Sequence, residues 1–304
     1  MAWPRRKTVL IVALLSLLSP RVFAHQPEFP PAFPPIRPEA VPLVQMPGAE
    51  PAREEEPENP FEDAIETDRD SFTPATTTVG RGRLVIESAY SFLDNRGVKE
   101  THSFPELLGR YGLTERLELR LGWNYEVGGV GSDTSGSDVG TEELAFEKGL
   151  QRDSKLVYGM KYQVTKQDAW LPNSVVILQA STPTSGTETN TLVVGTYAFG
   201  WELPGRWKLD AAIRYGMGKE SDDHFNEWAP SVVLKVPFGE RLLAHAEYFG
   251  LFSTGKAQEF TRHYFSPGLH YLVTPNLEVG FRVGWGLNDQ SARFSSNVGF
   301  GCRF

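Results

Sequence analysis

Charged side chains recur at every second position in long stretches of this chain, and they are the residues that could select a solute. In 117–127, Glu118, Arg120 and Glu126 alternate with apolar residues. A β-strand sends successive side chains to opposite faces, so such a strand has one polar and one apolar face. The same alternation assigns the following residues to the polar face: Arg83, Glu87, Arg110, Glu118, Arg120, Glu126, Lys155, Lys161, Lys208, Asp210, Arg214, Lys235, His245, Glu247, Glu278, Arg282 and Arg303. Basic residues outnumber acidic ones on this face, although the whole chain carries a formal net charge of -8.

These charges have two principal interpretations if the polar faces enclose a lumen. A cationic lining would favour anions, because rings of charge in a narrow pore filter solutes by sign. Alternatively, the charges pair across neighbouring strands and fill a narrow barrel. Asp68, Arg69 and Asp70 precede the first expected strand and are similarly ambiguous. They are either a charged latch that folds back into the mouth of the lumen or a solvated lead-in.

Catalysis is the weakest of the chemical interpretations. Outer-membrane lipid hydrolases use Ser and His on barrels, and here Ser266 with His263 or His270 is the candidate pair. The six His form no helix pair with metal-ligating spacing, and no nucleotide-binding fingerprint is present. We expect no enzyme activity, no catalytic residue, no metal and no cofactor. The acidic balance also argues against nucleic acid as a partner.

The elements that position these charges are predicted to be long β-strands. The alternation persists for about ten residues in 117–127, 207–218 and 277–287. Strands of about 9–11 residues cross a membrane, whereas strands of soluble sheets have about 5–6. Twelve segments fit: 81–93, 101–111, 116–127, 155–165, 173–182, 191–201, 206–218, 228–238, 241–252, 263–273, 276–287 and 293–304. The sequence therefore predicts an all-β fold, a transmembrane antiparallel up-and-down β-barrel of about 12 strands (10–14), with 142–152 the candidate for a further strand.

The connections and the aromatic residues agree with a barrel in the outer membrane. Turns at 112–116, 166–172, 202–206, 238–241 and 274–276 are short, whereas 128–154, 183–190, 219–227 and 253–262 are longer and more polar. Short periplasmic turns with longer external loops are typical of such barrels. The residues expected at the two membrane interfaces are Trp123, Tyr125, Trp207, Tyr215, Trp228, Trp285 and Phe304. We expect outer-membrane lipid as one partner, and the barrel-assembly machinery as another through the last strand, which ends on Phe304.

The N-terminal part is predicted to direct export. Basic residues at 5–7, an apolar run over 9–18 and a small-residue site at 22–24 form a signal peptide, cleaved after Ala24. Residues 25–66 contain many prolines and an acidic run, which predicts a disordered periplasmic arm. The barrel domain is then 67–304, in the outer membrane of a Gram-negative bacterium. Cys302 is the only cysteine, so no internal disulfide can form.

Four stretches of this chain resemble a known family. They read TDRDSFT at 67–73, GRLVIESAY at 82–90, FPELL at 104–108 and RYGLTERLELR at 110–120. These are similar to the outer-membrane barrels of the MetA-pathway-of-phenol-degradation family, which are also labelled transporters. The resemblance implies a barrel that handles small molecules, aromatic ones among them, and no established catalytic motif. We expect a channel for small, aromatic or anionic solutes; the alternative is a structural or partner-binding barrel that conducts nothing.

Overall fold

The structure of the protein is a computed structural model. It describes residues 63–69, 71–97, 99–128, 151–186, 189–220, 223–256 and 259–304. The predicted signal peptide, the arm up to residue 62 and most of the expected loop 128–154 lie outside these residues, as does Asp70.

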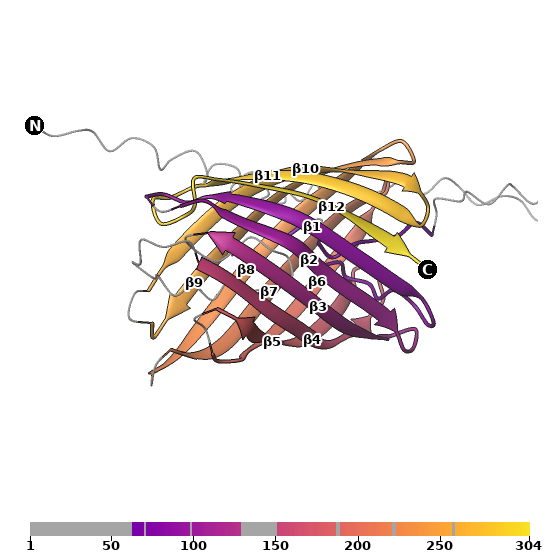
Figure 1. The fold of residues 1–304 in the computed structure, drawn as a ribbon. Coiled ribbons are helices and arrows are strands. Elements are labelled where there is room, and N and C mark those ends of the chain that lie inside the picture. Colours follow the sequence, from indigo (N-terminus) through magenta and orange to yellow (C-terminus); the bar gives the residue numbers. More distant parts are fainter. Residues whose placement is uncertain are drawn as a thin grey trace, which may run out of the picture. The chain divides into compact units, whose positions relative to one another are not determined.

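The described chain forms twelve antiparallel β-strands (Figure 1). Their bounds are β1 Leu84–Asp94, β2 Thr101–Gly112, β3 Leu117–Gly128, β4 Gln151–Thr165, β5 Asn173–Ser185, β6 Leu192–Leu203, β7 Trp207–Glu220, β8 Asp223–Phe238, β9 Leu242–Thr254, β10 Thr261–Thr274, β11 Leu277–Gly286 and β12 Phe294–Arg303. Each strand pairs with its neighbours in sequence, and β1 pairs with β12 to close the barrel. Closure leaves no strand edge without hydrogen-bond partners. The predicted fold class is confirmed.

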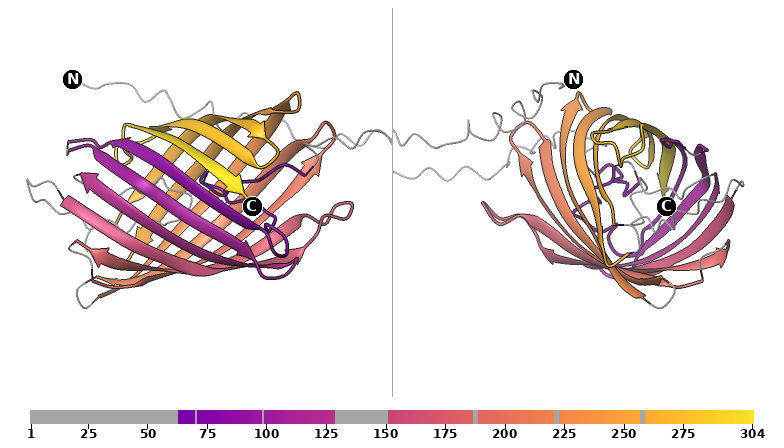
Figure 2. Two further views of the ribbon diagram at one scale, coloured as in Figure 1. Left: turned by 45° about the vertical axis from the view of Figure 1, so that its right-hand side comes forward. Right: turned by 90° about the vertical axis from the view of Figure 1, so that its left-hand side faces the viewer.

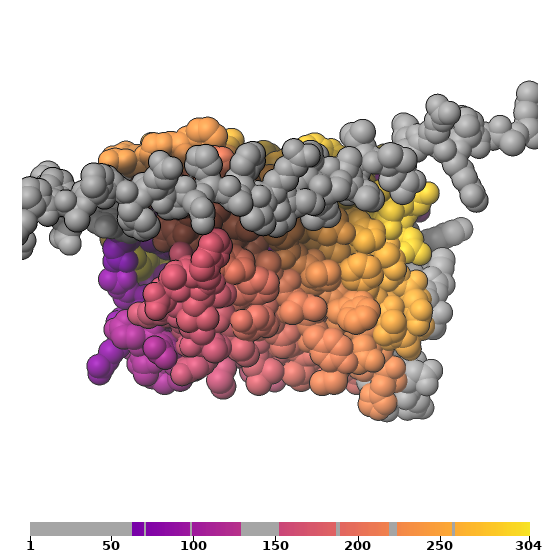
Figure 3. Space-filling view, turned by 180° about the vertical axis from the view of Figure 1, so that it is seen from behind, coloured from indigo at the N-terminus to yellow at the C-terminus, as the bar shows by residue number. Residues whose placement is uncertain are grey.

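Each strand separates its side chains as the alternation predicted. In β3, Leu119 and Leu121 are 44% and 61% exposed, whereas Glu118 and Arg120 are 0% and 4% exposed. The exposed large apolar side chains form the outer face of the strands. Figure 3 shows this outer surface from behind, with the strands coloured pink to orange at its centre. An apolar exterior around a charged interior is the reverse of a water-soluble protein, and lipid is the solvent that such an exterior suits.

The connections differ in length at the two ends of the barrel. The end that carries the β2–β3, β4–β5, β6–β7, β8–β9 and β10–β11 turns is called the turn end below. Gly205 and Gly239 have positive φ angles there, which let two of these turns reverse tightly. The prediction of a loop over 219–227 was wrong, because β7 continues to Glu220 and β8 begins at Asp223. Lys219 and Glu220 still pair with His224 and Asp223 across this hairpin. The expected loop 128–154 also loses its last residues to β4, which begins at Gln151.

A segment without regular structure lies inside the barrel. Residues 63–69 and 71–80, called the inner segment below, run within the ring of strands, as the end-on view in Figure 2 shows. Phe72 and Ala75 are 0% exposed. Ile65 donates a backbone hydrogen bond to the Pro275 carbonyl at 2.8 Å, so the segment already contacts the barrel before residue 67, where its domain was expected to begin. None of the described residues forms a helix long and apolar enough to span a membrane.

Candidate functional site: the occupied lumen

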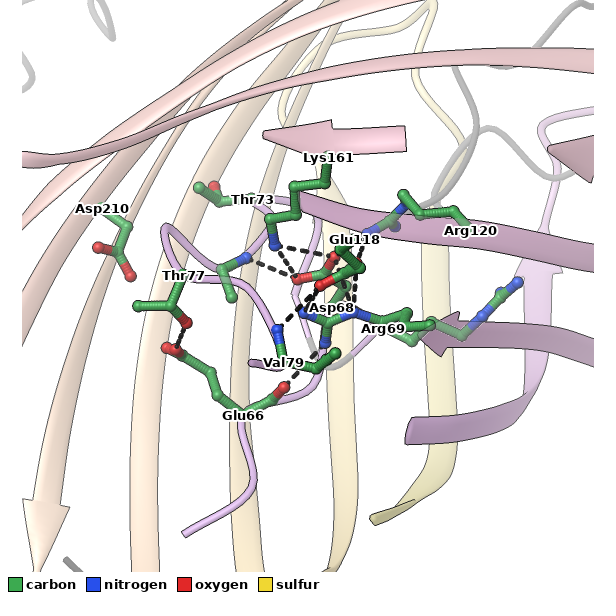
Figure 4. A network of polar contacts seen from close by, with 12 residues as sticks. Glu66, Asp68, Arg69, Thr73, Thr77, Val79, Glu118, Arg120, Lys161 and Asp210 are labelled. Atoms are coloured by element: carbon green, nitrogen blue, oxygen red, sulfur yellow. Dashed lines mark hydrogen bonds and ion pairs between the residues drawn. The ribbon is translucent and has the colours of Figure 1, made fainter. Parts of the chain in front are cut away.

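Asp68 of the inner segment lies among three cations of the barrel wall (Figure 4). Its carboxylate is 2.5 Å from the Arg120 guanidinium, 3.1 Å from the Lys161 ammonium and 3.6 Å from the Arg110 guanidinium. These cations come from β3, β4 and β2, three adjacent strands. Arg110 lies directly opposite Arg120, and Lys161 lies opposite Glu118, two residues along β3 from Arg120. All four side chains are at most 2% exposed. Charge-assisted hydrogen bonds of this kind are among the stronger contacts in proteins.

Two wall carboxylates complete the charge balance around Asp68. Glu118 contacts Arg110 and Arg120, each at 2.9 Å, and Glu87 contacts Arg110 at 3.0 Å. Three wall cations therefore face two wall carboxylates, and Asp68 supplies the third negative charge. Removing one partner of a buried ion pair costs about 3–5 kcal/mol, because the remaining charge stays buried without compensation. The wall is electrically complete only while the inner segment is in place.

Carboxylates of the wall also hold the backbone of the inner segment. Glu87 accepts hydrogen bonds from the backbone N–H groups of Asp68 and Arg69, both at 2.9 Å. Further along the inner segment, Glu247 of β9 accepts the N–H groups of Phe72 at 2.8 Å and Thr73 at 2.6 Å. These carboxylates supply acceptors that an isolated segment in a lumen could not obtain from a neighbouring strand.

Phe72 fills an aromatic slot in the lumen. Its ring stacks on Phe249 with 4.2 Å between centroids and 9° between planes, and Phe249 stacks in turn on Tyr264 at 4.8 Å. The Arg214 guanidinium lies 4.0 Å from the centroid of the Phe72 ring and donates a hydrogen bond to the Phe72 carbonyl. Stacking and cation–π contacts at a buried site each contribute about 0.5–2 kcal/mol beyond the burial of area.

The carboxylates of the inner segment are held in their ionised form. Burial alone raises the pKa of Asp68, but the positive charges of Arg110, Lys161 and Arg120 outweigh it and hold the pKa well below its ordinary value. Burial likewise raises the pKa of Glu66, and Lys208 and Lys235 lower it further than burial raises it. The segment therefore presents negative charge to the wall throughout the neutral range.

A cavity of about 670 Å³ occupies the turn end of the barrel. The inner segment lines it with Asp63 and Glu66, and the barrel wall lines it with Arg110, Lys208 and Lys235. Glu66 is 3.3 Å from the Lys208 ammonium and 3.8 Å from that of Lys235. The cavity thus reaches from the turn end to the cations around Asp68, where the inner segment crosses the lumen.

The structure brings most of the expected lumen residues together inside the barrel. Those that are buried there are Glu87, Arg110, Glu118, Arg120, Glu126, Lys155, Lys161, Asp210, Arg214, Lys235, His245, Glu247, Glu278 and Arg282. Arg83 does not join them, because it precedes β1 and its side chain, 45% exposed, pairs with Asp63 at the rim. Lys208 and Arg303 lie at the cavity. The expected interface aromatics all lie on the outer face or at the chain end, from partly buried Trp123 to Phe304, which is 69% exposed.

Several site residues were not identified from the sequence. Glu66 lay in the segment expected to be disordered, and Phe72 carried no signal because a single Phe outside a strand has no periodicity. Glu106 and Asn124 bind Arg69 at 3.4 and 3.1 Å. The alternation in β3 places Asn124 on the inward face, but only charged residues of that face were taken as candidates. For Asp68 and Arg69, the structure supports the latch interpretation.

The Ser–His interpretation finds no geometric support. The Ser266 hydroxyl donates to the Val283 carbonyl at 2.9 Å. His270 pairs with His245 at 2.6 Å within the lumen, and His263 pairs with Tyr248 at 2.7 Å on the outer face. Among the residues that the structure describes, no group of three or more His, Cys, Asp or Glu is arranged to hold a metal ion.

Twelve strands closed into a barrel, apolar outside and charged inside, define a β-barrel of the outer-membrane type. The chain belongs to the family described as "Putative MetA-pathway of phenol degradation", whose model matches residues 67–304. The COG4313 outer membrane channel from Pseudomonas putida F1 is similar in fold, with a TM-score of 0.54 and 12% identity over 75% of this chain and 98% of that chain. The translocator domain of the autotransporter NalP from Neisseria meningitidis has a TM-score of 0.48 and 14% identity over 74% of this chain and 89% of that chain. No curated protein sequence matches the chain.

Proposed function

We propose that this protein is a channel of the outer membrane whose lumen is closed by its own inner segment. The observation that carries the proposal is the way the segment is held. It contributes no strand to the barrel, and the ladder of twelve strands is continuous without it. Its main attachments are ion pairs, hydrogen bonds to wall carboxylates and one aromatic stack. A segment held in this way can leave while the wall keeps its shape, which is the two-state element that gating requires.

The proposed solutes are small and anionic or aromatic. The cations around Asp68 and at the cavity would favour anions, and the slot under Phe72 would accept a ring. The family description names phenol degradation, which agrees with an aromatic solute. The barrel of Pseudomonas putida is described as an outer membrane channel, which agrees with the proposed class of protein. Export by the predicted signal peptide and assembly through the strand ending at Phe304 are parts of the same proposal.

A barrel that conducts nothing is the second candidate. The complete burial of Asp68, Phe72 and Lys161 favours it, because a lumen filled in this way could serve as a permanent core. The two candidates differ in whether the inner segment leaves the lumen on the time scale of transport.

A reversible cross-link separates the two candidates. The Thr73 and Ser231 hydroxyl oxygens are 2.8 Å apart, one on the inner segment and one on β8. Cysteines at both positions, in a chain that also carries Cys302→Ser, would tie the segment to the wall when oxidised. The measurement is planar-bilayer conductance of one protein sample before and after reduction, so the reduced sample is its own matched control.

The channel is expected to give current steps after reduction and none while oxidised. The single variant Thr73→Cys with Cys302→Ser should conduct in both conditions, which excludes an effect of the reductant. If neither the reduced cross-link variant nor the wild-type chain gives current steps, the channel is contradicted and the second candidate is favoured.

A further inference from the structure

We propose that Arg110, Arg120 and Lys161 form a binding site for the carboxylate group of a small solute, and that Asp68 occupies this site while the barrel is closed. The inference deepens the proposed function and rests on it for the route by which a solute arrives. The inner segment would then be a competitor of the solute, and a bound carboxylate would keep it out of the lumen.

Lys161 depends on Asp68 for the acceptors that its ammonium contacts. The Lys161 ammonium is 0% exposed and donates to both carboxylate oxygens of Asp68, at 3.1 and 3.2 Å. Within the described part of the chain, no other acceptor contacts this ammonium. When the segment leaves, this cation loses both of the acceptors that it contacts, and an anion in the lumen can replace them.

The three cations and the wall carboxylates that contact them keep a net positive charge when Asp68 leaves. Glu87 and Glu118 remain on the wall and compensate two of the three cations. Among these five wall side chains one positive charge is left over, which matches one carboxylate and would be exceeded by a dianion. Asp68 shows the geometry that this charge accepts: one of its oxygens contacts Arg120 at 2.5 Å and both contact Lys161. The site is therefore suited to monocarboxylates.

The cavity at the turn end gives access to the three cations. Arg110 contributes to the site and also lines the cavity of about 670 Å³ at the turn end, so the site borders space that a small solute can enter. Glu66, Lys208 and Lys235 line the same cavity, and the two lysines would attract an anion on its way to the site.

Chemical rescue with acetate tests the site in the full chain. Asp68→Ala removes the carboxylate group that the three cations contact, and leaves a space beside them that the carboxylate group of acetate can enter. Thermal unfolding of the refolded variant is measured against rising sodium acetate, with sodium chloride at equal ionic strength and neutral acetamide as the reference solutes. Asp68→Asn is the matched control, because its amide fills the same space. Asp63→Ala removes a carboxylate that is 68% exposed at the rim.

For Asp68→Ala we expect Tm to rise saturably with acetate, at a concentration about tenfold lower than that of chloride giving the same shift. Asp68→Asn and Asp63→Ala should respond to acetate and chloride alike. Equal responses to the two salts in Asp68→Ala, or the same acetate effect in Asp63→Ala, would overturn the site. If Asp68→Ala does not refold, the variant Thr73→Cys in the Cys302→Ser chain is used instead. Sodium acetate should make a thiol reagent modify this cysteine faster than sodium chloride does. Equal rates in the two salts would overturn the site.

The outcome does not depend on whether the barrel conducts. If acetate raises the Tm of Asp68→Ala but the bilayer shows no current steps, the carboxylate site is supported and the channel is contradicted. If reduction of the cross-link produces current steps but acetate does not change the Tm of Asp68→Ala, the channel is supported and the carboxylate site is contradicted.

Discussion

Asp68 meets three cations inside the barrel, and its ionisation controls how strongly the inner segment is held. Its pKa in the folded chain is well below the ordinary value of 3.8. A group with a depressed pKa stabilises the docked state above its ordinary pKa, and this stabilisation is lost as pH falls toward the folded-state pKa. The attachment of the segment should therefore stay constant between about pH 5 and 8 and weaken below about pH 4.

The corresponding prediction concerns conductance at low pH. We expect the open probability of the wild-type channel in planar bilayers to rise as pH falls below about 4. Asp68→Asn, which lacks this carboxylate, should be more open already at pH 7 and should change less on acidification. A wild-type channel that closes further in acid would show that Asp68 does not hold the segment.

At the scale of the strand, the position of each side chain along the barrel determines what a charge there costs. Phe281 lies in the middle of β11 and is 51% exposed on the apolar outer face. Arg at the middle of a membrane-crossing strand costs about 2–4 kcal/mol and near the interface about 0–1 kcal/mol. Phe281→Arg should therefore lower the free energy of unfolding in lipid vesicles by about 2–4 kcal/mol.

Leu277→Arg is the matched control for this prediction, because Leu277 has the same parity and begins the same strand at the turn end. It should cost about 0–1 kcal/mol in the same measurement. Equal costs at the two positions would mean that β11 does not cross the hydrocarbon region.

The strands were predictable from the sequence because their alternation is local. In 207–218, the odd and even positions assign Leu209 and Ile213 to one face and Asp210 and Arg214 to the other. The structure gives the same two faces. The end of β7 was not predictable, since residues 219–227 are polar and cross-strand pairing extends the hairpin through them. Which cation Asp68 would meet was also beyond the sequence, because Arg110, Arg120 and Lys161 come together only through the register of β2, β3 and β4.

At the scale of the whole molecule, the protein combines a closed wall of strands with a filling, the inner segment, that adds no strand to the barrel. The wall is stabilised by twelve strand pairings and by the lipid around it. The filling is stabilised by contacts at separate levels of the lumen, among which are Glu66 with Lys208, Asp68 with its three cations, and Phe72 with Phe249. Local opening of such a filling requires less free energy than unfolding of the wall.

The reactivity of the thiol in Thr73→Cys tests both whether the inner segment lies in the lumen and whether it can leave it. Thr73 is 0% exposed. In Thr73→Cys with Cys302→Ser, reconstituted in vesicles, modification by a small charged thiol reagent should be slow and limited by opening. Adding Phe72→Ala removes about 3 kcal/mol of buried aromatic contact and should accelerate the reaction about a hundredfold. Phe281→Ala on the outer face is the control and should leave the rate unchanged. Immediate modification without Phe72→Ala would show that the segment is not in the lumen, and no modification even with it would show that the segment never leaves.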